Sequence, residues 1–193
     1  RAHGIPHAVC GKVVVATDVS ELPRLRELHS RAIANGVQGV ALIGPERLRE
    51  IEPHAAGIQA LHVPATGIVD FAGVARQYAD IVRRLGGEIR LGTRVLATRR
   101  HGADWVIETD QEVVRSRYLV NCAGLHADRI ARMSGSTRGL RIVPFRGDYY
   151  RLAPDRDALV RALIYPVPDP AFPFLGVHFT RMMRGGVEAG PNA

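Results

Sequence analysis

One segment near the C-terminal end of the chain combines side chains that could bind an anionic substrate. Residues 175–180 predict a strand that ends at Arg181, and because side chains alternate along a strand, His178 and Thr180 share one face while Arg181 lies on the other. An arginine can donate two parallel hydrogen bonds to a carboxylate or a phosphate. Taken alone, the segment favours simpler interpretations, a histidine satisfied within the core and a solvated arginine at the strand end.

A second arginine lies in an interrupted strand pattern. Arg146 stands between Pro144 and Gly147, and Tyr149 and Tyr150 follow. The planar guanidinium group suits recognition of a carboxylate or a phosphate, so Arg146 is a second candidate for anion binding. The alternative interpretation is a surface arginine at a β-bulge.

A third segment could bind an anionic cofactor. Residues 118–122 form an apolar run that leads into Ala123 and Gly124, and a helix is predicted to follow to about Ser134. Small residues at such a turn let a ligand approach the backbone, and the start of a helix offers free N–H donors. The local pattern alone favours a tight turn in which glycine is needed for steric reasons.

Composition narrows the classes of function. The 193 residues are 46% hydrophobic, and no apolar run reaches the ~18 to 20 residues of a membrane helix. The net charge is +7, but the basic residues are scattered, so we do not expect nucleic acid binding. Cys10 and Cys122 lie outside CxxC settings, and His126 and Asp128 would point to different sides of a helix, so no metal site is predicted. The default location is a reducing compartment, the cytoplasm.

The pattern of apolar residues and breakers predicts a mixture of helices and strands. Predicted helices cover residues 20–34, 45–52, 70–85 and 125–134. Predicted strands cover residues 9–16, 37–43, 59–63, 88–91, 94–98, 103–108, 111–115, 118–122, 142–152, 163–165, 175–180 and 186–189. The proline-rich residues 166–170 predict a stiff loop. The prediction is an α+β (mixed α/β) fold with a parallel element around residues 70–122.

Several motifs together carry a wider resemblance. They are Cys10-Gly11-Lys12, Thr66-Gly67-Ile68-Val69-Asp70, Asn121-Cys122-Ala123-Gly124-Leu125 with Ala127-Asp128, Val143-Pro144-Phe145-Arg146-Gly147, Leu163-Ile164-Tyr165-Pro166-Val167-Pro168-Asp169-Pro170, Phe172-Pro173-Phe174-Leu175-Gly176-Val177-His178-Phe179-Thr180 and Gly190-Pro191-Asn192-Ala193. The chain resembles the L-2-hydroxyglutarate oxidase/dehydrogenase family of FAD-dependent enzymes, which belongs to the larger D-amino-acid oxidase type of fold. The Tyr-Pro-Val-Pro and Gly-Val-His-Phe-Thr-Arg parts are the most specific.

The resemblance implies a division of the chain. Residues 1–67 and 140–193 would form a discontinuous substrate domain, a β-sheet with flanking helices over the flavin, and residues 68–139 would form part of a Rossmann-like FAD-binding domain. The family's GxGxxG turn and its C-terminal flavin loop do not occur in this sequence. We therefore expect an internal fragment of an enzyme, inactive by itself and prone to self-association through the unpaired edge of residues 118–122.

The resemblance also implies roles for particular residues. The expected cofactor contacts are Val95, Cys122, Ala123, Gly124, Asp128, Gly147 and Gly190. The expected substrate-binding and catalytic residues are Arg146, Tyr149, Tyr165, His178 and Arg181, with the two arginines binding the substrate carboxylates and the other three as polar partners. The resemblance leaves the catalytic base unidentified and implies that it lies in the family's N-terminal part, which this sequence lacks.

The implied reaction is oxidation of L-2-hydroxyglutarate, a small dicarboxylate, to 2-oxoglutarate by hydride transfer to FAD. The resemblance leaves the electron acceptor open between oxygen and a quinone, and a quinone would imply a peripheral position at the inner face of a membrane. The alternative is a non-catalytic, stand-alone binding or interaction module derived from the same fold.

Overall fold

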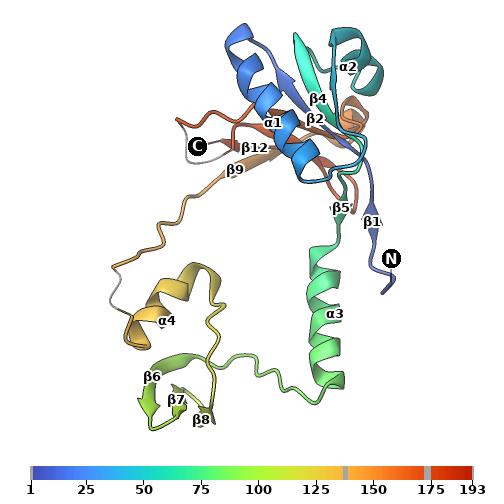
Figure 1. Cartoon of the computed structure of the whole chain (residues 1–193). Coiled ribbons are helices and arrows are strands. Elements are labelled where there is room, and N and C mark those ends of the chain that lie inside the picture. The colour runs from blue at the N-terminus through green and yellow to red at the C-terminus, as the bar shows by residue number, and fades with distance from the viewer. Residues whose placement is uncertain (1, 137–138, 172–174, 193) are drawn as a thin grey trace. The chain divides into compact units, whose positions relative to one another are not determined.

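The computed structural model describes residues 2–136, 139–171 and 175–192 (Figure 1). The chain divides into two compact units, and the first comprises the residues up to Tyr78 together with those from Gly147 onward. The second unit comprises residues 79–146, so the boundary falls within helix α3 (Phe71–Arg84). The division into a substrate domain (residues 1–67 and 140–193) and part of an FAD-binding domain (residues 68–139) stays a prediction. Residues 172–174 and 193, which belong to the quoted motifs, lie outside the described part.

A mixed sheet forms the centre of the first unit. Among the described residues its strand order is β3-β4-β2-β10-β11-β12-β9. The strands are β2 (Lys12–Ala16), β3 (Ala41–Ile43), β4 (Gln59–Val63), β9 (Asp148–Arg151), β10 (Leu163–Pro166), β11 (His178–Arg181) and β12 (Val187–Asn192). Strands β2 and β10 pair in parallel, and the other neighbours are antiparallel. A separate short pair joins β1 (His7–Ala8) to β5 (Ile68–Val69).

Two helices cover opposite faces of this sheet, at the end where β2 and β4 lie. Helix α1 (Leu22–Ala34) follows a 3-10 turn, η1 (Val19–Glu21), and helix α2 (Pro45–Ile51) follows β3. The residues buried with α1 are Val14, Ala16, Leu25 and Leu61. The residues buried with α2 are Val13, Val15, Leu48 and Ala60. Because neighbouring residues of β2 and β4 join different clusters, the alternation along each strand assigns one face to each helix. The mixed sheet with flanking helices confirms the predicted fold class.

A capping box begins the turn that leads into α1. The Asp18 carboxylate accepts a hydrogen bond from the Ser20 amide (2.8 Å), and the Glu21 carboxylate accepts from the amides of Thr17 (2.7 Å) and Asp18 (3.2 Å). These contacts satisfy N–H groups that a helix start otherwise leaves free. The hydrogen bonds from Ser20 also lower the pKa of Asp18.

A buried carboxylate joins α2 to the start of β10. Glu52 directly follows α2 and is fully buried. Its carboxylate accepts hydrogen bonds from the Arg161 amide, at 3.0 and 3.1 Å, and from the Ala162 amide. The short 3-10 helix η3 (Pro154–Leu159) precedes these two residues. Glu52 therefore fixes the backbone at the point from which β10 carries Tyr165 into the sheet.

The second unit contains a small antiparallel sheet and one helix. Its strands are β6 (Val95–His101), β7 (Asp104–Thr109) and β8 (Val113–Ser116), which confirms the predicted hairpin around Asp110. Helix α4 (Ala127–Met133) follows the turn η2 (Gly124–His126) and packs against β6. The hydroxyl groups of Thr98 and Ser134 lie 2.9 Å apart and connect β6 to the end of α4.

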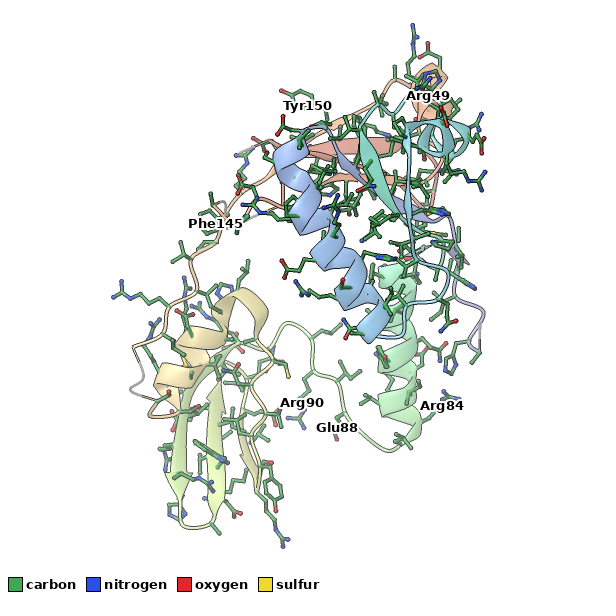
Figure 2. All side chains as sticks on the ribbon, turned by 45° about the horizontal axis from the view of Figure 1, so that its top comes forward. Arg49, Arg84, Glu88, Arg90, Phe145 and Tyr150 are labelled. Atoms are coloured by element: carbon green, nitrogen blue, oxygen red, sulfur yellow. The ribbon has the colours of Figure 1, made fainter. Side chains whose placement is uncertain are left out.

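Two predicted strands do not form, and several others are shorter than predicted. Residues 88–91 are irregular, and the Arg90 guanidinium group pairs with the carboxylates of Glu88 and Glu112. Arg90 and Glu88 are labelled in Figure 2. Hydrogen bonds to Glu88 and then to Glu112 raise the pKa of Arg90. Residues 118–122 form no strand, because no segment of the described residues pairs with them. Of the predicted strand 142–152, only β9 forms, since Pro144 lacks the N–H that a ladder needs.

The parallel element also lies elsewhere than predicted. The parallel pair joins β2 to β10, whereas the strands within residues 70–122 are antiparallel. Strands β2 and β10 lie far apart in the sequence, so no local βαβ pattern predicts that they pair.

The half-buried His62 on β4 makes the stability of the first unit dependent on pH. Burial, and then the positive charge of Arg47, lower the pKa of His62. Protonation therefore favours the unfolded chain, and the free energy of unfolding should fall as the pH drops below the unfolded pKa of about 6.5. Urea unfolding between pH 8 and pH 5 measures this loss, which His62→Gln should reduce and the exposed-site variant His54→Gln should not. An unchanged pH dependence in His62→Gln would contradict this assignment.

Candidate functional site

One half of a sheet face carries polar and aromatic side chains that α1 does not bury. The register pairs Ile164 with Phe179, so Tyr165 lies opposite His178 across β10 and β11. On β12, Gly190 is the partner of His178 and Glu188 is the partner of Thr180. On β9, Arg151 is the partner of Glu188. Alternation then places one set of side chains on the same face, namely Tyr149, Arg151, Leu163, Tyr165, His178, Thr180 and Glu188.

His178 is enclosed by two tyrosine rings. Its ring stacks on that of Tyr165, with centroids 4.3 Å apart and an angle of 16° between the planes. The Tyr149 ring meets it edge-on at 6.1 Å and 77°. Lys12 on β2 adds a positive charge 5.2 Å from the centroid of the Tyr165 ring. His178 is only 7% exposed, so its ring has a fixed position.

The hydrogen bond of His178 determines where its proton lies. Nδ1 is 3.0 Å from the carbonyl oxygen of Gly176. A carbonyl oxygen only accepts, so Nδ1 must carry the hydrogen and donate it. In the neutral ring, Nε2 then holds the free lone pair and can accept a proton. The structure thus fixes which ring nitrogen of the neutral histidine donates and which one accepts.

Two glycines predicted to contact the flavin have close packing neighbours in the first unit. An ideal Cβ on Gly190 would lie 2.6 Å from Tyr149 Cδ1 and 2.8 Å from the Asp148 carbonyl oxygen. An ideal Cβ on Gly147 would lie 2.5 Å from Pro191 Cβ. Glycine at position 190 therefore lets the Tyr149 ring cross β12 and reach His178. Contact of either glycine with flavin stays a prediction.

Substitution of Gly190 by alanine should displace Tyr149. The new methyl group would overlap the ring and the backbone of β9, so we expect a loss of about 1 to 3 kcal/mol in the free energy of unfolding. The ring resonances of Tyr149 and His178 should shift in NMR spectra. Gly44→Ala is the matched control, because an ideal Cβ there meets nothing within 4 Å. Unchanged ring resonances in Gly190→Ala would contradict the packing role.

A cavity of about 530 Å³ borders this face within the first unit. Its walls are residues 67–71, residues 181–185 and the residues Arg151, Leu163, Tyr165, Thr180 and Glu188. The arginines of the lining are Arg151, Arg181 and Arg184, and its carboxylates are Asp70 and Glu188. The Asp70 carboxylate also pairs with Arg76, at 3.3 Å, and Arg76 does not line the cavity. The cavity therefore offers arginine donors to a small anion, from Arg151 and Arg184.

The structure places the two predicted anion-binding arginines differently. Arg181 borders the cavity, but alternation puts its side chain on the face opposite to His178, and its Nη1 donates to the Arg161 carbonyl oxygen (2.8 Å). Arg146 is the last residue of the second unit. The carboxylate-binding roles of both residues stay predictions.

Arg151, which the sequence analysis did not single out, lies on the face that carries Tyr165. The signal was present, because Arg151 follows Tyr149 by two residues on one strand and so shares its face.

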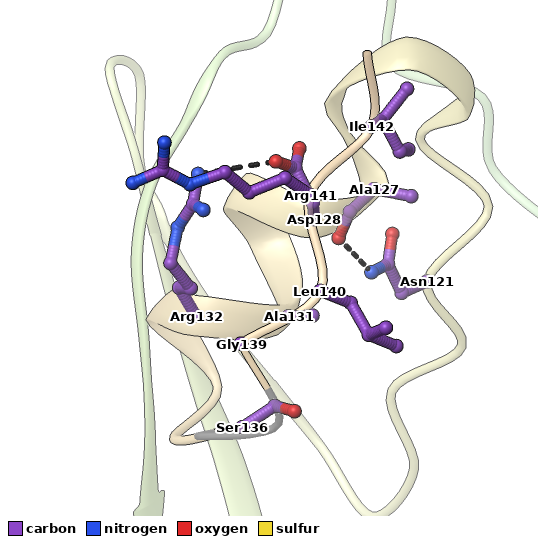
Figure 3. Close-up of a pocket in the computed structure, with 10 residues that line it drawn as sticks. All are labelled: Asn121, Ala127, Asp128, Ala131, Arg132, Ser136, Gly139, Leu140, Arg141 and Ile142. Carbon is purple, nitrogen blue, oxygen red and sulfur yellow. Dashed lines mark hydrogen bonds and ion pairs between the residues drawn. The ribbon is translucent and has the colours of Figure 1, made fainter.

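Four of the predicted cofactor positions of the second unit, residues 122–124 and Asp128, lie at or just before the start of α4, and Figure 3 shows Asp128 there. The Asn121 side chain donates to the Ala127 carbonyl oxygen (2.8 Å) and accepts from the Ala123 amide (3.2 Å), which holds the turn. Ala123 and Gly124 are exposed, and an ideal Cβ on Gly124 meets nothing within 4 Å. Asp128 pairs with Arg132 at 3.3 Å. A cavity of about 710 Å³ adjoins Asn121, Ala127 and Asp128.

This open backbone of small residues fits a nucleotide laid along it. Cys122 is also exposed, and Val95 begins β6 opposite Thr109. Within the described ranges, no group of three His, Cys, Asp or Glu side chains could hold a metal ion. No helix in the same ranges is long and apolar enough to cross a membrane.

Comparison with known proteins identifies the family. The family model described as FAD dependent oxidoreductase matches residues 1–193. The L-2-hydroxyglutarate dehydrogenase of Indibacter alkaliphilus is 48% identical over 190 residues, which are 98% of this chain and 48% of that protein. The chain thus spans about half the length of the curated relatives it matches.

Solved structures show the same fold. L-proline dehydrogenase from P. horikoshii has a TM-score of 0.86 at 19% identity. The superposition covers all of this chain and 51% of the dehydrogenase chain. The FAD-bound L-alpha-glycerophosphate oxidase from Mycoplasma pneumoniae has a TM-score of 0.81 at 18% identity, over 98% of this chain and 50% of its own. The solved structures share the fold of this chain, and the family match along the whole sequence shows that the chain belongs to the FAD dependent oxidoreductase family.

Proposed function

We propose that this chain forms part of a flavoenzyme that oxidises L-2-hydroxyglutarate to 2-oxoglutarate. The observation that carries the proposal is the 48% identity, along 98% of the chain, to a protein named for oxidation of that substrate. The arginines that line the cavity beside Tyr165 support it, because a doubly negative substrate needs positively charged groups around it.

The reaction removes one hydrogen from the carbinol carbon of the substrate and one from its hydroxyl group. When bound, FAD supplies the acceptor for the hydride that leaves the carbinol carbon. His178 takes the hydroxyl proton on Nε2, so that the C–O bond becomes the carbonyl of the product. Tyr165 and Tyr149 hold the imidazole ring in place, and the hydrogen bond to Gly176 makes Nδ1 the donor, so that Nε2 is the acceptor of the neutral ring.

Particular residues are proposed to bind the substrate and the cofactor. Arg146 and Arg181 are proposed to bind substrate carboxylates, because a guanidinium group can donate two parallel hydrogen bonds to a carboxylate. The residues proposed to hold FAD are Val95, Cys122, Ala123, Gly124, Asp128, Gly147 and Gly190. The exposed, small side chains at positions 123 and 124 support close approach of a nucleotide to the backbone.

The fate of the electrons determines where the enzyme works. A quinone acceptor would bring the enzyme to the inner face of a membrane, whereas oxygen would leave it in the cytoplasm. Turnover without oxygen, with and without a soluble quinone, decides between the two.

Expression of the complete coding frame that contains these residues, in parallel with the 193-residue chain, tests the proposal. The complete protein should carry FAD, and L-2-hydroxyglutarate, but not its D-enantiomer, should bleach the flavin absorbance. The 193-residue chain alone should be inactive and should self-associate in light scattering. A complete protein without flavin, or with a flavin that the substrate does not reduce, would refute the proposal and favour a non-catalytic binding module.

A further inference from the structure

Lys12, at the start of β2, lies against the ring of Tyr165. Its Nζ is 5.2 Å from the centroid of that ring. The parallel register pairs Lys12 with Leu163, and alternation along β10 then puts Lys12 and Tyr165 on the same face of the sheet. The face of an aromatic ring carries negative electrostatic potential, so it attracts the ammonium group.

No carboxylate competes with the ring for this ammonium group. Among the residues that the structure describes, no hydrogen bond or ion pair involves Lys12 Nζ. The side chain borders a cavity of about 410 Å³ between α1 and the sheet, and the other charged residue in the lining of that cavity is Arg31 on α1. The contact with Tyr165 is therefore the interaction that fixes the position of the ammonium group.

Tyr165 connects this contact to His178. Strands β2 and β11 are the two neighbours of β10, so Lys12 and His178 approach Tyr165 from opposite sides. The imidazole stacks on the phenol ring at 4.3 Å, with 16° between the planes. Because two stacked rings restrict each other, a change in the tilt of the Tyr165 ring also tilts the imidazole. The ammonium group on β2 thus helps to determine the orientation of the histidine on β11.

We propose that Lys12 is a positioning residue for the reaction: its ammonium group fixes the ring of Tyr165, and the stacked ring directs Nε2 of His178 toward the substrate hydroxyl. This inference rests on the proposed function for the role of His178 as the base. Lys12 itself contacts neither substrate nor flavin in this assignment. Its loss should therefore slow the chemical step and leave the affinity for the substrate unchanged.

Stopped-flow reduction of the flavin in the complete protein tests the kinetic part. Lys12→Met keeps the length of the side chain and removes its charge. It should lower the limiting rate about three- to tenfold, which corresponds to about 0.6 to 1.4 kcal/mol, in the range of one cation–π contact. The concentration of L-2-hydroxyglutarate that gives half the limiting rate should not change. Lys12→Arg should restore the rate, since a guanidinium group also binds the face of a ring.

Arg31→Met is the matched control. It removes a positive charge from the wall of the same cavity, which Tyr165 does not line, and it should keep the normal rate. An unchanged limiting rate in Lys12→Met would overturn the inference. A raised half-saturating concentration in Lys12→Met would also overturn it, because Lys12 would then bind the substrate.

NMR spectroscopy of the 193-residue chain tests the contacts without turnover. Lys12 is the only lysine in the sequence, so carbon-13 labelling of lysine gives one set of side-chain signals, and the Tyr165 ring should shift the Hε signal upfield. Tyr165→Leu should abolish that shift. Lys12→Met should move the ring resonances of His178, whereas Lys12→Arg and Arg31→Met should leave them near their normal positions.

Unmoved His178 resonances in Lys12→Met would show that Lys12 does not orient the imidazole. This readout does not depend on the reaction. If L-2-hydroxyglutarate does not reduce the flavin of the complete protein, the proposed function fails, and the His178 resonances still decide whether Lys12 positions the ring.

Discussion

Replacement of His178 by asparagine should lower turnover of L-2-hydroxyglutarate by the flavin-loaded enzyme about a hundredfold or more. The asparagine amide can take the place of Nδ1 and donate to the Gly176 carbonyl oxygen, so the local backbone should be retained. What disappears is the basic Nε2, and proton transfer by a positioned base contributes roughly 10² to 10⁴ in rate. Stopped-flow measurement of flavin bleaching gives the rate of this step directly.

Two further variants separate catalysis from structure. His178→Gln places an amide near the position of Nε2 but supplies no base, and it should be as slow as asparagine. His54→Gln removes an exposed histidine outside the site and should leave the rate unchanged. If His178→Asn kept a third or more of the normal rate, His178 would have a structural role and the base would lie elsewhere.

On the polar face of the sheet, the sequence predicts which residues of one strand share a face, because side chains alternate along a strand. His178 and Thr180 share a face because they are two residues apart, and the structure places them so. Arg151 follows Tyr149 by the same rule. Arg151 was not predicted, because the pattern of Pro144 and Gly147 favoured Arg146, which lies before the strand begins.

Features that depend on pairing between distant strands could not be predicted. The stack of Tyr165 on His178 requires the register of β10 with β11, and the passage of Tyr149 over Gly190 requires that of β9 with β12. The same limit explains residues 118–122. Their apolar pattern shows that they can form a strand, but a strand also needs a partner, and a local pattern does not supply one.

Glu52 is a further case, because its partners lie more than 100 residues away along the chain. Loss of this carboxylate should be the most destabilising single change in the first unit. Glu52→Ala would leave the buried amide of Ala162 and the amide of Arg161 without their acceptor. Each unsatisfied buried donor costs about 1 to 3 kcal/mol, so we expect the free energy of unfolding to fall by about 2 to 5 kcal/mol.

The measurement combines urea unfolding with hydrogen exchange at residues 161 and 162, whose amides should lose protection in Glu52→Ala. Glu52→Gln keeps one acceptor oxygen and should lose less. Glu50→Ala is the matched control, because Glu50 is an exposed carboxylate on the same helix, paired with Arg47, and should change stability by no more than about 0.5 kcal/mol. Since β10 starts at these amides, the stack of Tyr165 on His178 should also loosen in Glu52→Ala. Unchanged stability and unchanged exchange in Glu52→Ala would show that the carboxylate does not hold β10.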